Sequence, residues 1–463
     1  MAWLVNIRIT RKNLAQMWVK NHRFGQDFYY LCRKIHNNMR NTIICALVII
    51  LAIGCNQQPD YIVIESKSDN CKVLNLDPVF EQNPWDTTTI SDIVDTIKIV
   101  ALETTRESIL SRISKLKIFG DRMVIHDGNE GIAIFDINGK YIRHIRRGQG
   151  PGEINASFDF DADSQYLYIL QQDKISKFTL DGEFVEYYPL PEKYMTALDK
   201  IKKIDDGFLL SKYPFSSEAI NYEAFLTDDN LNEKNHFVFE HKFVGFGGSV
   251  FKIMDGKIVF YMSLCNTIFQ FDGKTFSPYC ILNYPKYENT FETNPDCTNL
   301  AAGDFFRVHC KERKYFFDGH LYKTSNVLCL SFMDMEPRII YLDTQNGKFR
   351  AQLRPSDRDM PYQHLLYDCG GIVCEHNDYI VRTLQPEYYL TEPVMSEAMR
   401  AEIQEKFNID LSNTTKVEKD KDWYSKLQHI SAEDVLKLKN AKNNDNPLLV
   451  FIKFKHIPDD PKN

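Results

Sequence analysis

The clearest pattern along the chain is an alternation of apolar and polar residues over residues 113–191, interrupted at short intervals by Gly, Asn and Asp. Two copies of one unit follow each other there, and each copy contains four short alternating runs. The third and fourth runs are joined by Asn138-Gly139 in the first copy and by Asp181-Gly182 in the second. Such runs predict antiparallel strands, and Asn-Gly and Asp-Gly pairs favour tight hairpin turns. A four-stranded unit recurring at roughly 40 residues is typical of a propeller blade.

The following part of the chain extends the same pattern. One blade cannot bury both of its faces, so the sequence must supply further blades. Three more are predicted, within residues 201–240, 249–282 and 314–353, and Gly-containing turns separate many of their strands. Residues 285–313 are less regular and are predicted to be a partly helical insertion.

The sixth blade is predicted to be split. Two strands fall within residues 371–382, a helical insertion follows at 396–407, and a second helix begins at Ser431, which suits an N-cap. Residues 448–454 are apolar on both faces and predict a central strand that returns to the sheet. The blade then lacks one strand, which residues 96–102 can supply and thereby remove the open edges of the ring. The expected fold class is all-β, a six-bladed β-propeller with small helical insertions.

Several short motifs of the chain resemble those of a known protein family. They are Leu102-Glu103-Thr104-Thr105, the strand at 113–118, the turn at 135–140, Gly148-Gln149-Gly150-Pro151-Gly152-Glu153, and the C-terminal runs 430–434 and 446–450. In these motifs the chain resembles the six-bladed β-propeller lipoproteins of gut Gram-negative bacteria, which are distantly similar to NHL-repeat propellers. The resemblance covers about residues 96–455. It implies a propeller at the cell envelope, and because most of that family has no assigned role, it names no ligand.

Residues 39–54 have the features of a lipoprotein export signal. A short charged start at Met39 precedes an apolar stretch and a small residue before Cys55, the expected lipidation site. Ala52 stands where Leu is usual, and an N-terminal anchor that is never cut is the alternative. Residues 1–38 precede a complete signal, so either the start is assigned too early or the chain carries a genuine extension.

The predicted organisation therefore has five segments. They are residues 1–38, a mis-assigned start or extension; 39–54, the signal peptide; 55–92, a polar tether with one short strand at 61–64; 93–456, the propeller; and 457–463, a tail. Deleting residues 1–84 is predicted to cost little stability.

The charge of the chain argues against a nucleic-acid partner. Eight of the 56 basic residues and one of the 63 acidic residues precede Cys55, which leaves 48 against 62 and a formal charge of −14 after it. An acidic domain repels phosphate backbones, and export from the cytoplasm also argues against a nucleic-acid partner.

Eight cysteines follow Cys55. Cys265 and Cys329 lie in apolar runs and predict buried thiols, whereas Cys297 and Cys310 flank the irregular insertion and are the favoured disulfide pair, although sequence alone leaves the pairing open.

The Gly-rich segment 148–153 invites comparison with a phosphate-binding loop. It lacks the Gly-Lys-Ser/Thr ending and opens no helix, so a tight crossover between blades is the favoured interpretation. Arg143, Arg146 and Arg147 come just before it. They either line a face that meets acidic groups or are ordinary exposed strand residues, and the second reading is favoured.

Two clusters have the residue types of a metal site. Asp159, Asp161 and Asp163 alternate as in a calcium loop, but the Gly and the distal Glu of an EF-hand are missing. Cys369, Cys374 and His376 lie close in sequence, but their spacing matches no standard zinc ribbon, so buried thiols are favoured. We therefore predict no metal and no cofactor. The chain also carries no Gly-x-Ser-x-Gly or His-Glu-x-x-His signature.

Two functions remain compatible with the sequence. The favoured one is a lipid-anchored, non-catalytic binding propeller at the outer membrane, facing the periplasm or the cell surface. It would use loops at one end of the channel to bind a glycan, peptide or protein. The alternative is a hydrolase or lyase with a metal at the central channel, because propeller enzymes of that kind exist.

Replacing Cys55 tests the export signal. The Cys55→Ala variant is expected to accumulate as an unlipidated precursor, whereas the unmodified protein should partition with membranes, since two or three acyl chains anchor a protein stably. Fractionation and mass spectrometry of the N-terminus measure both outcomes. A wild-type protein recovered wholly in the soluble fraction would contradict the prediction.

Overall fold

The computed structural model describes residues 62–64, 71–82, 87–128, 130–150, 152–195, 198–212, 221–240, 248–288, 313–334, 337–352, 354–355, 359, 362, 365–366, 372–386 and 426–458. The chain divides into two units, Met1–Asp60 and Tyr61–Asn463, and all described residues belong to the second.

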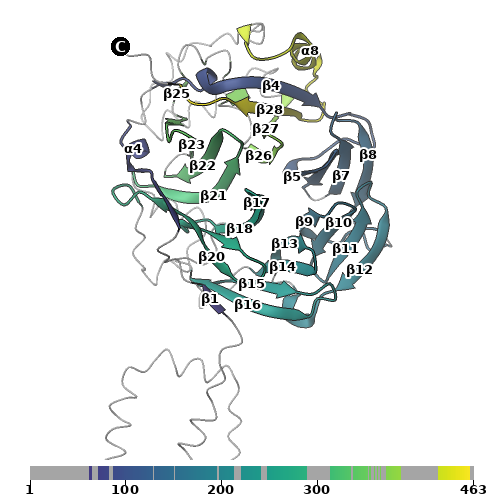
Figure 1. The fold of residues 1–463 in the computed structure, drawn as a ribbon. Coiled ribbons are helices and arrows are strands. Elements are labelled where there is room, and N and C mark those ends of the chain that lie inside the picture. Colours follow the sequence, from purple (N-terminus) through teal and green to yellow (C-terminus); the bar gives the residue numbers. More distant parts are fainter. Residues whose placement is uncertain are drawn as a thin grey trace, which may run out of the picture. The chain divides into compact units, whose positions relative to one another are not determined.

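The strands of this unit form six antiparallel blades around a common centre, which confirms the predicted fold class (Figure 1). Blade 1 contains β5 (Ile113–Phe119), β6 (Arg122–Asp127), β7 (Gly131–Asp136) and β8 (Tyr141–Arg146); blade 2 contains β9 (Ser157–Ala162), β10 (Tyr166–Gln171), β11 (Lys174–Thr179) and β12 (Phe184–Pro189). Blade 3 contains β13 (Leu198–Ile204), β14 (Gly207–Lys212), β15 (Asn221–Thr227) and β16 (Glu233–Glu240); blade 4 contains β17 (Ser249–Met254), β18 (Lys257–Met262), β19 (Thr267–Phe271) and β20 (Phe276–Asn283). Blade 5 contains β21 (Phe316–Lys323), β22 (Val327–Met333), β23 (Pro337–Asp343) and β24 (Phe349–Ala351); blade 6 contains β26 (Ile372–His376), β27 (Tyr379–Leu384), β28 (Leu448–Phe454) and β4 (Val94–Ala101).

The first strand of each blade lies nearest the centre of the ring, and the last lies nearest the rim (Figure 1). Side chains from the two faces of each sheet pack against the neighbouring blades, so the core is a series of layers between blades. Phe160, for example, is fully buried in the layer that also contains Ile134 and Ile145 of blade 1.

The ring is closed by two strands from opposite ends of the domain. β4 pairs antiparallel with β28, with Ile99 opposite Val450 and Ile97 opposite Ile452. This confirms the predicted closure of the sixth blade. Ile99 is completely buried, in the layer that contains Tyr341 of blade 5, so its side chain faces the neighbouring blade as the alternation along the strand predicts.

The segment predicted as a polar tether contacts the propeller instead. β1 (Ile62–Ile64) adds a parallel strand to β16, and β2 (Lys72–Asn75) adds one to β20. The short helix α4 (Asp77–Phe80) then buries Phe80, whose ring stacks on Tyr315 at 4.4 Å between centroids. The strand predicted at 61–64 is present as β1. Pairing to an open sheet edge uses backbone groups and needs little apolar periodicity, which is why composition missed β2 and the contact of both strands with the propeller. Deleting residues 1–84 is therefore expected to destabilise the domain, contrary to the prediction from composition.

The helix predicted near Ser431 is α8 (Ala432–Asn440). The Ser431 hydroxyl caps it by accepting a hydrogen bond from the Asp434 amide at 3.1 Å. Lys437 extends from the helix to the carbonyl of Ile99 on β4, at 3.0 Å, which links the helix to the closing strand. The predicted helical insertion at 396–407 and most of that at 285–313 lie outside the described residues.

In the described part of the chain, no helix has the length and apolar character needed to cross a membrane.

Placing a charge at Ile99 tests the closure. Ile99→Asp would bury a carboxylate with no partner, and the free energy of unfolding is expected to fall by about 4 kcal/mol or more. Lys98→Asp is the matched control, because Lys98 is exposed on the same strand. Urea or thermal denaturation measures both variants. If Ile99→Asp unfolds at the wild-type midpoint, the closure by β4 is wrong.

Candidate functional site

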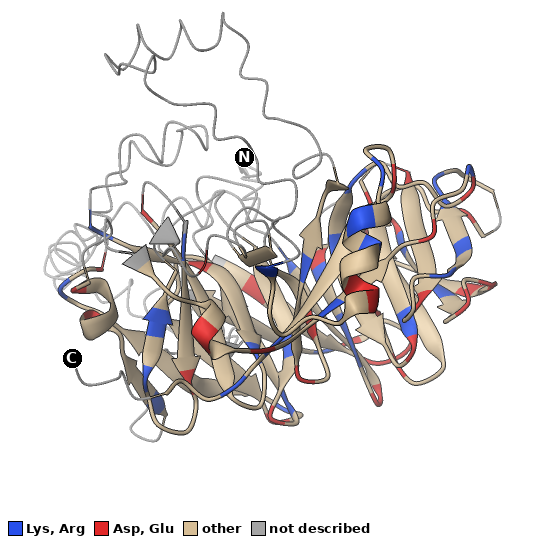
Figure 2. Cartoon of the chain, turned by 90° about the horizontal axis from the view of Figure 1, so that it is seen from above, with Lys and Arg blue, Asp and Glu red and all other residues tan. Residues whose placement is uncertain are grey.

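The two ends of the ring differ in the length of their connections. We call the end that carries the links between blades, and those between second and third strands, the crossover face; the other end is the turn face. Turns such as Gly120-Asp121 and Asp255-Gly256 join strands at the turn face, whereas β16, β20 and β27, which precede the three longest connections, end at the crossover face. Long connections held on a rigid scaffold are where propellers and similar folds place binding residues. Figure 2 shows basic and acidic residues interspersed over the strands and turns of the ring.

A carboxylate holds the inner strands of blades 1, 2 and 3 together. Asp159 of β9 is only 3% exposed, and its Oδ1 accepts from Lys115 at 2.8 Å and from Lys117 at 3.2 Å, both on β5. Its Oδ2 accepts from the amide of Ile201 at 3.2 Å, on the otherwise open edge of β13. Burial by itself would raise the pKa of Asp159, but Lys115, Lys117 and Lys200 together hold it well below its usual range.

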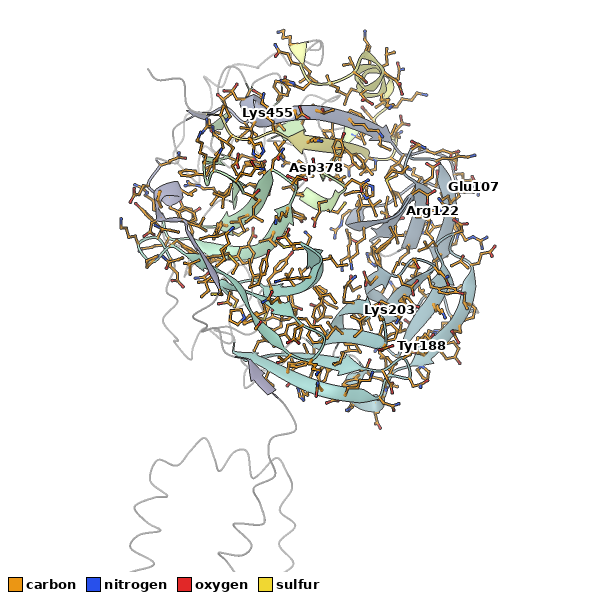
Figure 3. The ribbon with its side chains drawn as sticks, in the orientation of Figure 1. Glu107, Arg122, Tyr188, Lys203, Asp378 and Lys455 are labelled. Carbon is orange, nitrogen blue, oxygen red and sulfur yellow. The ribbon has the colours of Figure 1, made fainter. Side chains whose placement is uncertain are left out.

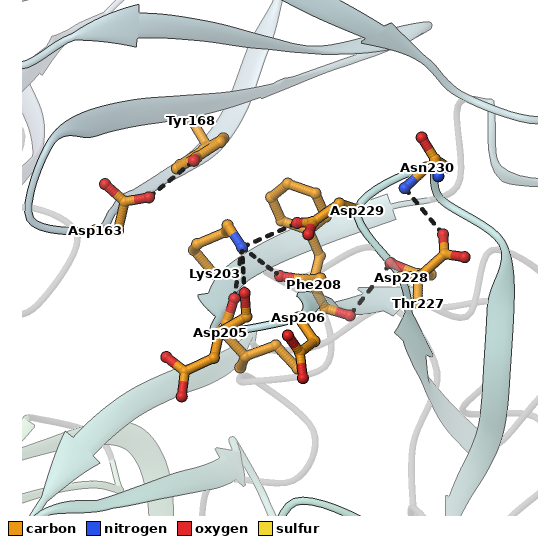
Figure 4. Close-up of polar contacts among 12 residues, drawn as sticks. Asp163, Tyr168, Lys203, Asp205, Asp206, Phe208, Thr227, Asp228, Asp229 and Asn230 are labelled. Carbon is orange, nitrogen blue, oxygen red and sulfur yellow. Dashed lines mark hydrogen bonds and ion pairs between the residues drawn. The ribbon is translucent and has the colours of Figure 1, made fainter.

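A second carboxylate on the same strand repeats this arrangement. Asp161 is 3% exposed and accepts from the Lys202 ammonium and from the Lys203 amide, each at 2.8 Å. The Lys203 ammonium continues toward the turn face, where it donates to Asp229 at 3.0 Å (Figure 4). Side chains fill the spaces between blades, and Lys203 occupies the one between blades 2 and 3, over the rings of Tyr168 and Phe208 (Figure 3).

On the other side of the ring, a lysine forms the contacts that join three blades. Lys252 of β17 forms an ion pair with Glu375 of β26 and donates to the carbonyl of Leu321 on β21 at 2.7 Å. Its ammonium also lies 4.4 Å from the ring centroid of Tyr322. This lysine joins blades 4, 5 and 6, as Asp159 joins blades 1, 2 and 3.

The alternating aspartates do not form a calcium loop. Asp159 and Asp161 are bound to lysines and to backbone amides, and Asp163 accepts from the amides of Gln165 and Tyr166 and from the Tyr168 hydroxyl. Ammonium groups occupy the positions that a cation would need. Within the described ranges, no group of three or more His, Cys, Asp or Glu is placed to hold a metal ion.

The cysteines in the described strands are free thiols. Cys329 is 1% and Cys374 8% exposed, and burial raises the pKa of both thiols. His376, on the same strand as Cys374, bonds to the Asn377 side chain. Cys265 is half-buried, whereas the sequence predicted a buried thiol, and it packs against the apolar layer between blades 3 and 4. Cys369 and the favoured pair Cys297 and Cys310 lie outside the described residues.

The Gly-rich crossover is closed by its own residues. The Glu153 carboxylate accepts from the amide of Gly150 at 2.8 Å, and the amide of Gly148 donates to the carbonyl of Ile154 at 2.9 Å. Gly152 adopts a φ of +81° and lies against Phe184, so a side chain there would be strained. These contacts support the structural interpretation of the segment.

Arg147 and Ile154, which flank this crossover, line a cleft between blades 1 and 2, on the crossover face. The cleft has a volume of about 190 Å³. Its lining residues are His126, Gly128, Gly131, Arg147, Ile154, Asn155, Ala156 and Ser157.

Of the three arginines singled out in the sequence, only Arg147 lines this cleft. Arg143 forms an exposed ion pair with Glu183 at 3.2 Å, and Arg146 is exposed at the end of β8. His126, Asn155 and Ser157 gave no signal in the sequence, because they come from separate segments that only the packing of blade 2 on blade 1 brings together. We take this cleft as the candidate functional site.

Comparisons with known proteins agree with the fold. Residues 71–453 match the family model described as Domain of unknown function (DUF4934). A comparison with curated proteins finds no match. A solved structure described as an exported protein of Bacteroides fragilis is 15% identical, with a TM-score of 0.55, and the alignment covers 85% of this chain and 100% of that one. A member of the DUF4221 family from Bacteroides vulgatus is 12% identical, with a TM-score of 0.44, over 78% and 97% of the two chains.

Acid titration tests the role of Asp159. Its folded pKa is depressed, so its stabilisation is fully present above the unfolded value of about 3.9 and is lost as pH falls toward the folded value. Asp159→Asn removes one partner of a buried pair and is expected to lower the free energy of unfolding at pH 7 by about 3–5 kcal/mol. The difference in the free energy of unfolding between Asp159→Asn and wild type should become smaller below about pH 4.

Glu107→Gln is the control for that experiment, because Glu107 is exposed. It should follow the wild-type stability from pH 7 to pH 3. A gap between Asp159→Asn and wild type that stays constant over this range would contradict the assignment of a depressed pKa.

Proposed function

This chain belongs to the family described as Domain of unknown function (DUF4934), and from its structure we propose a lipid-anchored, non-catalytic binding protein of the cell envelope. One observation carries the proposal. The charged groups nearest the channel are engaged with one another, whereas the cleft on the crossover face presents a guanidinium and a buried hydroxyl that no described residue binds.

The channel chemistry favours binding over catalysis. A hydrolase or lyase of the central-metal kind needs carboxylates or imidazoles free to coordinate the ion. Asp159 and Asp161 each accept from a lysine ammonium and from a backbone amide, and Glu375 is paired with Lys252. Each contact ties one blade to the next, so releasing a carboxylate for a metal would also remove a link between blades.

The location is supported by two independent features. The export signal at 39–54 ends at Cys55, which would carry the lipid in the outer membrane. The Bacteroides fragilis structure that shares the fold is described as an exported protein. A chain attached at Cys55 would meet a glycan, peptide or protein ligand in the periplasm or at the cell surface.

Metal analysis separates this function from the enzymatic alternative. We expect the purified full-length protein to contain no stoichiometric divalent ion, and we expect its melting temperature to be unchanged by EDTA, because the inner carboxylates are bound to ammonium groups. Elemental analysis and differential scanning calorimetry provide the two readouts. One equivalent of a divalent ion, with a melting temperature lowered by its removal, would favour a metal-dependent hydrolase or lyase.

A further inference from the structure

We propose that the cleft between blades 1 and 2 binds the carboxylate of a single sugar-acid residue, with Arg147 as the recognising group. The inference rests on the proposed binding function and names the ligand chemistry of the candidate site. It depends on four features of the cleft: its size, its charge, its neutral polar groups and the rigidity of its walls.

The size of the cleft limits the ligand. Pockets for drug-sized molecules have volumes of roughly 300–1,000 Å³, and the 190 Å³ cleft is smaller. It can enclose one small residue but no extended chain. A longer ligand would therefore place one residue in the cleft and continue along the crossover face.

The charge of the cleft favours a ligand with one negative charge. Arg147 is its only lining residue with a permanent charge, and no Asp or Glu is among those residues. Arg147 is exposed at the mouth of the cleft, and among the described residues none forms an ion pair or side-chain hydrogen bond with it. An unpaired guanidinium presents a planar pair of donors that matches a carboxylate in a bidentate arrangement. A ligand with many negative charges would be repelled by the acidic protein as a whole.

The other polar groups of the cleft are uncharged. The Ser157 hydroxyl is buried without a hydrogen-bond partner among the described residues. Burial, together with the nearby Lys115, lowers the pKa of His126, which favours the neutral imidazole, and its Nδ1 is hydrogen-bonded to the Ser114 hydroxyl. The Asn155 carboxamide is fixed at both ends: its Nδ2 donates to Asp173 at 2.9 Å and its Oδ1 accepts from the Ala156 amide at 2.6 Å, which leaves the second N–H of Nδ2 for a ligand. Neutral donors and acceptors beside one guanidinium suit a ligand with one carboxylate and several hydroxyls.

Backbone contacts hold the walls of the cleft in place. The amide of Arg147 donates to the Glu130 carbonyl at 3.0 Å, and the residue forms a parallel bridge with Ile154. Gly131 has a φ of +134°, and a Cβ there would lie 2.2 Å from the Ile145 carbonyl oxygen, so only glycine fits this wall. A preformed site loses less entropy on binding than a flexible one does.

The test uses two sugars that differ at one group. Methyl β-glucuronide carries a carboxylate where methyl β-glucoside carries a hydroxymethyl group, so the pair isolates the charge. Isothermal titration calorimetry on the full-length protein in detergent should give measurable binding for the glucuronide and binding at least tenfold weaker for the glucoside. N-acetylglutamate is the third probe, because it offers two carboxylates and no sugar ring, and it should also bind more weakly than the glucuronide.

Matched variants locate the site. Arg147→Gln should weaken glucuronide binding roughly 10- to 100-fold, as expected for loss of a charge-assisted hydrogen bond. Ser157→Ala should weaken it less. Arg146→Gln is the control: it removes the same charge from the neighbouring position, which does not line the cleft, and it should leave affinity unchanged. Thermal melting of each variant verifies that the fold is retained.

Several outcomes would overturn the proposal. These are equal binding of glucuronide and glucoside, equal loss in Arg146→Gln and Arg147→Gln, or tighter binding of N-acetylglutamate than of the glucuronide. Failure of all three probes to bind would also overturn it, while the wider binding function would still be judged by membrane fractionation and metal content.

Discussion

The pairing of β4 with β28 is the constraint on which the rest of the ring depends. It joins a strand near the start of the domain to one near its end, so blade 6 is complete only when both parts of the chain are present. An open ring would expose an edge and an apolar layer that includes Ile99 and Val450. Closure also fixes the positions of the inner strands, and the charged contacts at the centre require those positions.

Closure of the ring leaves the inner strands with an edge whose backbone groups have no strand partner. Each is the first strand of its blade, so one of its edges has no neighbouring strand within the sheet. The carboxylates of Asp159 and Asp161 accept hydrogen bonds from amides on the open edge of β13, and the lysines compensate their charge. On the opposite side, Lys252 reaches the carbonyl of Leu321 and the carboxylate of Glu375. At the centre of the propeller, Asp159, Asp161 and Lys252 thus act as structural links between blades.

The binding site that we propose lies instead where blades 1 and 2 meet at the crossover face. Blade 1 contributes His126 and Arg147, and the start of blade 2 contributes Ser157. The rim is used differently. β1 and β2 cover the outer edges of blades 3 and 4, which shields backbone groups that would otherwise invite pairing with another chain.

The sequence by itself determined the blades, because alternation of period two and Asn-Gly or Asp-Gly turns are local signals. It also determined the closing strand, through the count of strands in the sixth blade, and the cap at Ser431, through a contact between residues three apart. Only the tertiary structure decided what the charged residues do. Asp159 has the spacing of a cation ligand along its own strand, but its partners Lys115 and Ile201 come from other blades. No local pattern encodes such contacts, because they depend on how separate sheets pack.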